Sequence, residues 1–312
     1  NFMGLEYLTN VPLAQSRKEY LERLVSGGFG SKAETIPVFE SCGRVTAKAV
    51  YAHICAPHYA ASAMDGVAVS AKETFGATET TPVTLNPDQF LVLDTGDPIP
   101  EDKDAVIMVE DIVKNGDGSI TIHAAAAPWQ HIRQIGEDVC AGEMILPSHM
   151  TVSPAAIGAM IAGGVLEIEV IRKPVVGIIP TGDEIIPPCT DPKPGDILEF
   201  NGSIFSAMVR SWGAEAVVYP IVPDKFDQIK EMVAKAADEC DMVILNAGSS
   251  AGREDFSARV IRELGEVLYH GIAIKPGKPA ILGCRGEKGI LGVPGYPVSG
   301  SIVIEQLLQP LL

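Results

Sequence analysis

Two lysines separated by a Pro-Gly pair stand out in an otherwise acidic chain. Lys275 and Lys278 lie in the segment KPGKP, directly after an apolar run expected to be a strand ending at Ile274. A tight turn would direct both ammonium groups toward one place, and an ammonium group binds an oxyanion as a point charge. The spacing favours an oxyanion-binding turn, although, taken alone, a β-turn with two solvated lysines is the commoner use of such a segment.

Three further glycine-punctuated turns follow strand-like runs, at 180–184 (PTGDE), 246–250 (NAGSS) and 293–299 (VPGYPVS). In open parallel sheets, ligands bind beyond the carboxyl ends of the strands. Glycine allows close approach of the backbone to an anion, and following helices offer free N–H groups. Together with the lysine turn, these segments offer a ligand Thr181, Gly182, Asp183, Gly248, Ser249, Ser250, Gly277, Pro294, Gly295, Pro297 and Ser299.

Carboxylates accompany these turns. Asp183, Glu184, Asp224 and Asp255 follow strands or begin helices in the same region, and carboxylates facing phosphate-binding turns commonly hold Mg²⁺. Each has a structural alternative, since Gly-Asp turns are mostly structural and Asp255 suits a helix N-terminus. A fifth segment, SAMDGVAV, presents Asp65, which could equally be a turn former beside Gly66. The residues alone indicate a phosphorylated or oxyanion ligand, with a metal, in an α/β domain.

The elements that position these turns form two patterns. From 174 to 312, strand-like and helical segments alternate, which predicts a doubly wound, mostly parallel sheet. From 52 to 137 the apolar runs are short, and KNGDG at 114–118 indicates a hairpin, so an inserted, mostly β domain is expected. Residues 1–51 and 138–173 are predicted to form a discontinuous, mixed linker domain. Its helix at 15–24 is expected to pack with a helix at 153–163.

The charge and residue composition of the chain exclude several classes of binding partner. The formal net charge of −16 argues against a nucleic-acid-binding surface and against anionic membranes. Six cysteines, at 42, 55, 140, 189, 240 and 284, form no CxxC pair and are interpreted as reduced thiols. The first residues lack the features of a signal peptide, and no apolar run reaches transmembrane length. A cytoplasmic protein is therefore predicted. No GxSxG elbow or GxxxxGK[ST] P-loop is present.

Taken in order, the segments resemble the MoeA family and the gephyrin E domain. The resemblance spans nearly the whole chain, and its motifs are specific as a set although each is weak alone. It rests on SAMDGVAV, DTGDPIPEDKDAVIMVED, IRQIGEDV, IIPTGDEI, VYPIVPD, NAGSSAGREDF, AIKPGKPAILG and LGVPGYPVSGS. It implies a homodimeric molybdopterin molybdotransferase, which inserts molybdate into adenylylated molybdopterin with Mg²⁺ and releases AMP. It also implies a molybdopterin adenylyltransferase as a partner enzyme.

Residue roles follow from the same resemblance. It implies catalytic roles for Asp65, Glu184, Asp255, Lys275 and Lys278, with the lysines holding molybdate or the pterin phosphate. Mg²⁺ would be held by Glu184, Asp224 and Asp255. Beyond the turn residues named above, substrate contacts are implied for Thr95, Glu110 and Asp138, and Pro294 and Pro297 shape the last turn.

The chain departs from the family pattern in three motifs. NAGSS replaces the usual Gly-Gly-Val-Ser, Tyr296 replaces Asn in the PGNP turn, and Val67 replaces Tyr after MDG. The sequence also ends at Leu312, where the family continues into a small β domain, so a truncated chain or a member without that domain is expected. Some relatives carry a periplasmic-binding-protein-like domain after the MoeA part. The alternative function is a non-catalytic molybdopterin- or molybdate-binding scaffold derived from this family.

Overall fold

The computed structural model describes residues 11–246 and 253–312 and divides the chain into two compact units. Unit 1 comprises the described residues up to Lys32 together with Ile171–Leu312, and unit 2 comprises Ala33–Val170. Among the described residues, no helix has the length and apolar composition required to cross a bilayer. The predicted multidomain α/β fold is confirmed, as the two units show.

Unit 1 is built on a six-stranded sheet with the order β17-β14-β18-β22-β21-β19. The strands from β17 to β22 run parallel, whereas β21 and β19 complete the sheet in antiparallel fashion, so the sheet is mostly parallel as predicted. The strands are β14 (Val175–Pro180), β17 (Glu215–Val218), β18 (Met242–Asn246), β19 (Glu266–His270), β21 (Ile281–Arg285) and β22 (Lys288–Val293). Shorter strands are β1 (Val11–Pro12) with β20 (Ile272–Ala273), and β15 (Ile185–Ile186) with β16 (Ile197–Leu198).

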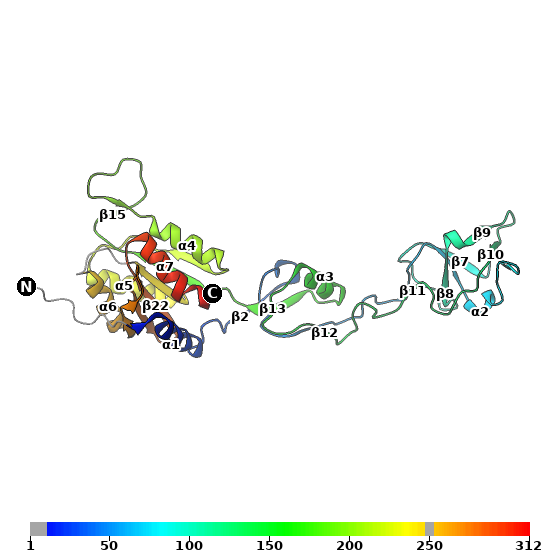
Figure 1. Cartoon of the computed structure of the whole chain (residues 1–312), viewed down its shortest axis with the longest axis horizontal. Helices are drawn as coiled ribbons and strands as arrows, with labels where there is room; N and C mark the ends of the chain where they lie inside the picture. The colour runs from blue at the N-terminus through cyan, green and yellow to red at the C-terminus, as the bar shows by residue number, and fades with distance from the viewer. Residues whose placement is uncertain (1–10, 247–252) are drawn as a thin grey trace, which may run out of the picture. The chain divides into compact units, whose positions relative to one another are not determined.

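Helices cover both faces of this sheet (Figure 1). One face packs against α1 (Leu13–Ser26), α4 (Asn201–Ser211) and α7 (Pro297–Leu307), which is followed by η3 (Gln309–Leu311). The other face packs against α5 (Phe226–Glu239) and α6 (Arg253–Leu264). Side chains alternate along each strand, so Met242 and Ile244 join the first core, whereas Val243 and Leu245 join the second. This two-sided burial explains why the strands are apolar runs without polar alternation.

The expected packing of the first helix was wrong. The buried side chains of α1, Ser16, Tyr20 and Leu24, are spaced four residues apart and form one stripe. Tyr20 and Leu24 join the core of unit 1, where the Tyr20 hydroxyl donates a hydrogen bond of 3.0 Å to the carbonyl of Gly283. The long aromatic side chain reaches a buried partner on the sheet, so α1 belongs to the core of the α/β unit, whereas the helix at 153–163 belongs to unit 2.

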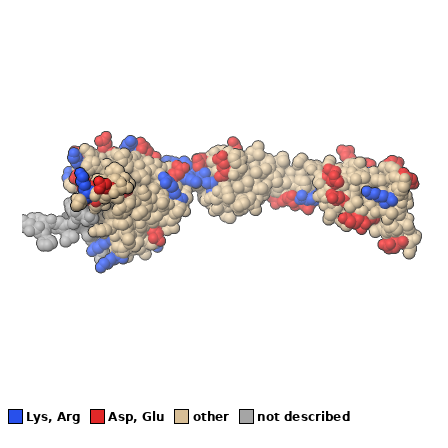
Figure 2. Space-filling model, turned by 90° about the horizontal axis from the view of Figure 1, so that it is seen from above, with Lys and Arg blue, Asp and Glu red and all other residues tan. Residues whose placement is uncertain are grey.

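Unit 2 contains several short sheets and separate hydrophobic clusters. The strands of one cluster form two three-stranded antiparallel sheets, β7-β5-β8 and β6-β10-β9, whose facing side chains include Val67, Leu85 and Ile122. The sheets consist of β5 (Gly66–Val69), β6 (Val83–Leu85), β7 (Phe90–Leu93), β8 (Ala105–Met108), β9 (Ile112–Lys114) and β10 (Ile120–Ile122), with α2 (Ala71–Thr74) and η2 (Val109–Asp111) between strands. The predicted hairpin at 114–118 joins β9 to β10. In Figure 2, Asp and Glu side chains gather in several places over this segment, with few Lys or Arg between them.

A second cluster surrounds α3 (Pro154–Ala162), which begins after Ser153 as predicted, with the Ala156 N–H donating to the Ser153 hydroxyl at 3.2 Å. The remaining elements are β2 (Ala33–Pro37) paired with β13 (Glu167–Ile171), β3 (Val50–Tyr51) with β12 (Met144–Leu146), β4 (Ala61–Ser62) with β11 (Ile132–Arg133), and η1 (Val38–Glu40). The separate clusters agree with an inserted β domain. Residues up to Lys32 belong to unit 1 and not to the predicted linker domain, whereas the proposed bounds of the β domain, 52 and 137, stay a prediction.

The position of α1 can be tested with a tryptophan reporter. The chain has two tryptophans, Trp129 in unit 2 and Trp212 in unit 1, so Trp129→Phe leaves a fluorophore only in the α/β unit. In that background, Leu24→Ala should lower the free energy of unfolding seen by Trp212 by about 2–5 kcal/mol, because it leaves a cavity under α1. Val25→Ala, on the 59% exposed neighbour, is the matched control and should change it by less than about 0.5 kcal/mol. Equal effects would show that α1 is not part of this core.

Candidate functional site

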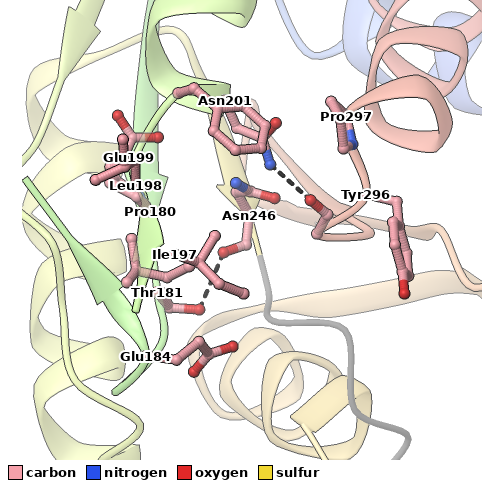
Figure 3. A pocket seen from close by; sticks show the side chains of 13 residues that line it. Pro180, Thr181, Glu184, Ile197, Leu198, Glu199, Asn201, Asn246, Tyr296 and Pro297 are labelled. Carbon is pink, nitrogen blue, oxygen red and sulfur yellow. Dashed lines mark hydrogen bonds between the residues drawn. The ribbon is translucent and has the colours of Figure 1, made fainter. Parts of the chain in front are cut away.

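A pocket of about 210 Å³ lies at the carboxyl ends of the parallel strands of unit 1 (Figure 3). The register places Pro180 at the end of β14 beside Asn246 at the end of β18, and Asn246 beside Val293 at the end of β22. The segments that follow these strands and the start of α4 therefore meet at one edge. The side chains that matter for binding are Thr181, Glu184, Glu199, Asn201 and Asn246, beside the turn Gly295–Pro297.

Two asparagine amides give the pocket its polar character. Asn201 is 6% exposed and Asn246 is 7% exposed, and both line the pocket from different elements. Asn201 Nδ2 donates to the carbonyl of Gly295 at 2.7 Å, and this bond does not use the Oδ1 atom of the same amide. Neither Asn201 Oδ1 nor Asn246 Oδ1 has a hydrogen-bond donor within the described part of the chain. Buried acceptors without a donor cost about 1–3 kcal/mol each, so they indicate a ligand that brings N–H or O–H groups.

Carboxylates gather beside the pocket on two neighbouring loops. Glu184 lines the pocket next to Thr181, whose hydroxyl donates to the carbonyl of Asn246 at 3.0 Å. On the adjoining loop the N–H of Asp224 donates to Asp183 Oδ1 at 3.0 Å. Gly182 connects these groups with a φ of 146°, and a Cβ there would lie 2.7 Å from Ile185. The residue must therefore be glycine for Asp183 and Glu184 to take their places.

These carboxylates suit a hard cation. Mg²⁺ is bound in proteins by one or two carboxylates, with waters and substrate phosphates completing the shell. Glu184, Asp183 and Asp224 provide such oxygens on adjacent loops. Among the described side chains, no group of three or more His, Cys, Asp or Glu forms a complete metal site. The predicted third ligand, Asp255, belongs to α6, but its side chain lies outside the described part, as do the predicted site residues Gly248, Ser249 and Ser250.

The lysine turn lies against the first turns of α7. Lys275 and Lys278 are exposed, and neither has an ion-pair partner among the described residues. Between them Gly277, with a φ of 111°, approaches α7 so closely that a Cβ would lie 2.7 Å from Val303 Cγ2 and 3.6 Å from the carbonyl of Ser299. Pro297, which begins α7, also lines the pocket. The N-terminal turns of α7 thus have the pocket on one side and the lysine turn on another.

Four of the predicted site residues, Asp65, Thr95, Glu110 and Asp138, belong to unit 2. Asp65 Oδ1 accepts two hydrogen bonds of 2.7 Å from Thr95, one from its hydroxyl and one from its N–H. The hydroxyl and then the N–H of Thr95 lower the pKa of Asp65, which is therefore ionised at neutral pH. Asp138 accepts from Arg133 Nη2 at 2.6 Å, and that hydrogen bond raises the pKa of the guanidinium. Glu110 is exposed in η2.

Sequence reasoning found part of this pocket and missed part of it. Of the predicted residues, Thr181, Glu184, Gly295 and Pro297 line it. Asn201, Asn246, Glu199 and the apolar wall formed by Ile185 and Ile197 were not predicted. Asn246 could have been recognised from the sequence, because it ends a fully apolar predicted strand. A polar amide at such a buried position needs hydrogen-bond partners, which a ligand can provide. The Asn-Gly pair at 201–202 is a second, weaker sequence signal. It indicates the start of a helix whose first residues could contact a ligand.

The departures from the family pattern have different structural contexts. Val67 is 1% exposed and belongs to the hydrophobic core of its small β cluster, so its side chain does not reach the surface. Tyr296 is 67% exposed and lines the rim of the pocket, where its ring can contact a bound molecule (Figure 3). The changed residues of the turn after Asn246 lie outside the described residues.

Comparison with known proteins gives matches along nearly the whole chain. Residues 11–164 match the family described as the MoeA N-terminal region (domain I and II), and residues 177–312 match the probable molybdopterin binding domain. A putative molybdopterin biosynthesis protein of Methanocaldococcus jannaschii is 30% identical, over 96% of this chain and 79% of that protein. The molybdopterin molybdenumtransferase of Haemophilus influenzae is 32% identical, over 96% and 76%. The crystal structure of a molybdopterin biosynthesis MoeA protein from Pyrococcus horikoshii matches with a TM-score of 0.83 and 32% identity, over 97% of this chain and 79% of that chain.

The bond between Asn201 and the Gly295 carbonyl should hold the wall of the pocket together. Asn201→Ala removes the donor from a part-buried carbonyl and should lower the free energy of unfolding reported by Trp212 by about 1–3 kcal/mol. Asn201→Asp, which keeps an acceptor of the same shape but loses the Nδ2 donor, should show a similar or larger loss. Ser203→Ala, at an exposed position of α4, is the control and should have little effect. An unchanged stability in both Asn201 variants would mean that the bond contributes nothing.

Proposed function

Because the chain belongs to the MoeA family, we propose that it is a molybdopterin molybdotransferase, which inserts molybdate into adenylylated molybdopterin and releases AMP. The observation that carries this proposal is the pair of buried amide oxygens, Asn201 Oδ1 and Asn246 Oδ1, without donors in a pocket at the carboxyl edge of the sheet. A pterin presents ring and exocyclic N–H groups, which are the donors that such acceptors need. The pocket is smaller than the roughly 300–1,000 Å³ typical of ligand sites, so it suits one part of an extended substrate.

The remaining features would bind the anionic parts of that substrate. The first N–H groups of α7 have no partner within a helix, and the helix dipole favours negative charge there. Lys275 and Lys278 add two ammonium groups beside the same helix. In a chain with a net charge of −16, these groups provide a local positive site for molybdate or for the phosphate of the pterin.

The carboxylates would hold the metal. Glu184 and Asp224, with Asp255 from the start of α6, are proposed as the groups that bind or orient Mg²⁺. Bound there, Mg²⁺ would neutralise negative charge as the phosphoanhydride of the adenylylated substrate opens. Thr181 and Gly182 position Glu184, because the Thr181 hydroxyl is fixed on the carbonyl of Asn246 and Gly182 permits the sharp change of direction.

Two partners follow from the proposed chemistry. The substrate carries an AMP group, so an adenylyltransferase acting on molybdopterin must supply it. We also propose that the chain works as a homodimer, in which Asp65, Thr95, Glu110 and Asp138 contribute to substrate binding or catalysis. The ionised state of Asp65 and its fixed bonds to Thr95 support a polar role, since the carboxylate is held in one orientation at the surface of its unit.

The proposed reaction can be tested directly. Purified protein is incubated with adenylylated molybdopterin, molybdate and Mg²⁺, and AMP is measured by chromatography. We expect AMP release that requires both molybdate and Mg²⁺. Tight binding of the adenylylated pterin without AMP release would reject the enzyme and select the alternative, a non-catalytic binding protein. Absence of both binding and release would reject a molybdopterin-related role altogether.

The lysine turn gives a specific prediction. A charge-assisted hydrogen bond contributes about 1.5–3 kcal/mol, and each 1.4 kcal/mol is tenfold in affinity, so Lys275→Ala or Lys278→Ala should weaken molybdate binding by roughly 10- to 100-fold. Calorimetric titration of molybdate in the presence of the pterin nucleotide measures this change. Lys235→Ala, on an exposed lysine of α5, is the matched control and should leave the affinity unchanged. If all three variants bind like the parent protein, the turn lysines are simply solvated.

The oligomeric state is a separate expectation. Light scattering at micromolar concentration should give a mass twice the 33.0 kDa of the chain. A mass of one chain at every concentration up to about 100 μM would contradict the homodimer without affecting the proposed ligand chemistry. Buried interfaces that hold obligate dimers are large, so dilution through this range should leave such a dimer intact.

A further inference from the structure

Two cysteines that are far apart in the sequence face each other on a two-stranded ribbon of unit 2. Ala56 and Val139 form an antiparallel bridge, with the Ala56 N–H donating to the Val139 carbonyl at 2.9 Å and the Val139 N–H donating back at 3.2 Å. Continuing this register by one residue places Cys55 opposite Cys140, at a position whose backbone groups do not bond to each other. In such pairs the Cα atoms lie about 4.5 Å apart. A disulfide requires a Cα separation of about 4.4–6.8 Å.

The sulfur atoms are directed toward the same space. A Cβ placed on Gly136 would lie 2.8 Å from Cys140 Sγ and 3.6 Å from Cys55 Sγ, so the two sulfurs cannot be further apart than the sum of these distances. Cys140 Sγ donates to the Gly136 carbonyl at 3.4 Å, and the N–H of Ala141 donates to Cys55 Sγ at 3.4 Å. Gly136 has a φ of 75°, and its missing side chain leaves room for both sulfurs.

Both thiols are accessible and free. Cys140 is exposed and Cys55 is partly exposed, whereas Cys240 and Cys284 are buried in the cores of unit 1. A metal is a poor alternative for the pair, because a closed thiolate site uses four ligands. No group of three or more possible metal ligands occurs among the described side chains. The remaining chemistry for two facing thiols is oxidation to a disulfide.

We propose that Cys55 and Cys140 form a reversible disulfide when the protein meets a low-molecular-weight disulfide as oxidant. The thiolate of Cys140 attacks the small disulfide, forms a mixed disulfide and releases one small thiol. The thiolate of Cys55 then attacks the sulfur of Cys140, which closes the Cys55–Cys140 bond and releases the second small thiol. Two protein thiols are oxidised, one small disulfide is reduced, and the two thiol protons pass to the released thiols.

The bond would close the chain around residues 56–139, which include the whole cluster of three-stranded sheets. The ribbon at its base has few restraints: the paired strands β3 with β12 and β4 with β11, the bridge at Ala56, and a small cluster of Ala52, Ala56 and Val139. A cross-link at this point reduces the freedom of the unfolded segment without altering the sheets themselves. Oxidation should therefore stabilise this segment more than it stabilises unit 1.

The experiment uses the full chain and oxidised glutathione as the probe, an acyclic disulfide that can release two thiols as the proposed step requires. The protein is incubated with it, alkylated and digested, and free thiols are titrated in parallel in denaturant. Six thiols titrate in the reduced protein. After oxidation we expect a peptide pair linked through Cys55 and Cys140, with no glutathione bound to either, and full recovery of six thiols with excess reduced dithiothreitol. Retention of all six thiols, or a linkage through other cysteines, would overturn the proposal.

Four variants separate this pair from the other exposed thiols. Cys55→Ser and Cys140→Ser should each abolish the protein disulfide, and Cys55→Ser should keep Cys140 as a mixed disulfide with glutathione, whereas Cys42→Ser and Cys189→Ser, on exposed cysteines elsewhere, should still form the Cys55–Cys140 bond. In a Trp212→Phe background, Trp129 reports on unit 2, and its thermal midpoint should rise by several degrees on oxidation of the parent but not of Cys55→Ser. Circular dichroism confirms that each variant is folded. A disulfide between two protein cysteines in Cys55→Ser would assign the reactive pair elsewhere.

Discussion

The parallel register of β18, which pairs Asn246 with Pro180 on one side and with Val293 on the other, determines where the pocket residues can lie. Because three strands end level with each other, the segments that leave them emerge at one edge. The chain then turns away from the sheet at Thr181 and Gly182 and, after β22, at Gly295–Pro297. The polar groups of the pocket are consequences of this pairing: the hydroxyl of Thr181 is fixed on the Asn246 carbonyl, and Asn201 is fixed on the Gly295 carbonyl. The site therefore depends on backbone hydrogen bonds that are themselves buried between two helical layers.

Much of this arrangement could be predicted from local patterns. The apolar runs at 174–179 and 242–245 predict strands, and the structure has strands at Val175–Pro180 and Met242–Asn246, buried on both faces of the sheet. Ser153 followed by Pro154 predicts a helix start, and α3 begins there. The turns could be recognised because glycine is needed at positive φ, as at Gly182 and Gly277. The pocket lining could not be predicted in the same way. Asn201 and Asn246 are separated by 45 positions in the chain, and only the tertiary structure, in which the start of α4 meets the end of β18, shows that both line one pocket.

The partner of α1 escaped prediction for a related reason. Its buried stripe indicates that one face is covered, but a stripe of Ser16, Tyr20 and Leu24 does not specify what covers it. The deciding contact is the Tyr20 hydroxyl on the Gly283 carbonyl, near the opposite end of the chain. Burial raises the pKa of Tyr20, so the phenol remains a neutral donor at any ordinary pH. Similarly, the pairing of Cys55 with Cys140 depends on a ribbon formed by two distant segments, which spacing in the sequence does not indicate.

The placement of α1 also has a consequence for biosynthesis. Tyr20 and its acceptor are separated by 263 residues, so β21 is made long after α1. A ribosome adds about 5–20 residues each second, so α1 is exposed for on the order of ten seconds or more before its docking surface exists. During that interval its apolar stripe, including Leu24, has no place in the native core. The apolar stripe of this segment therefore stays exposed until then, and the α/β unit can close only after β21 has been translated.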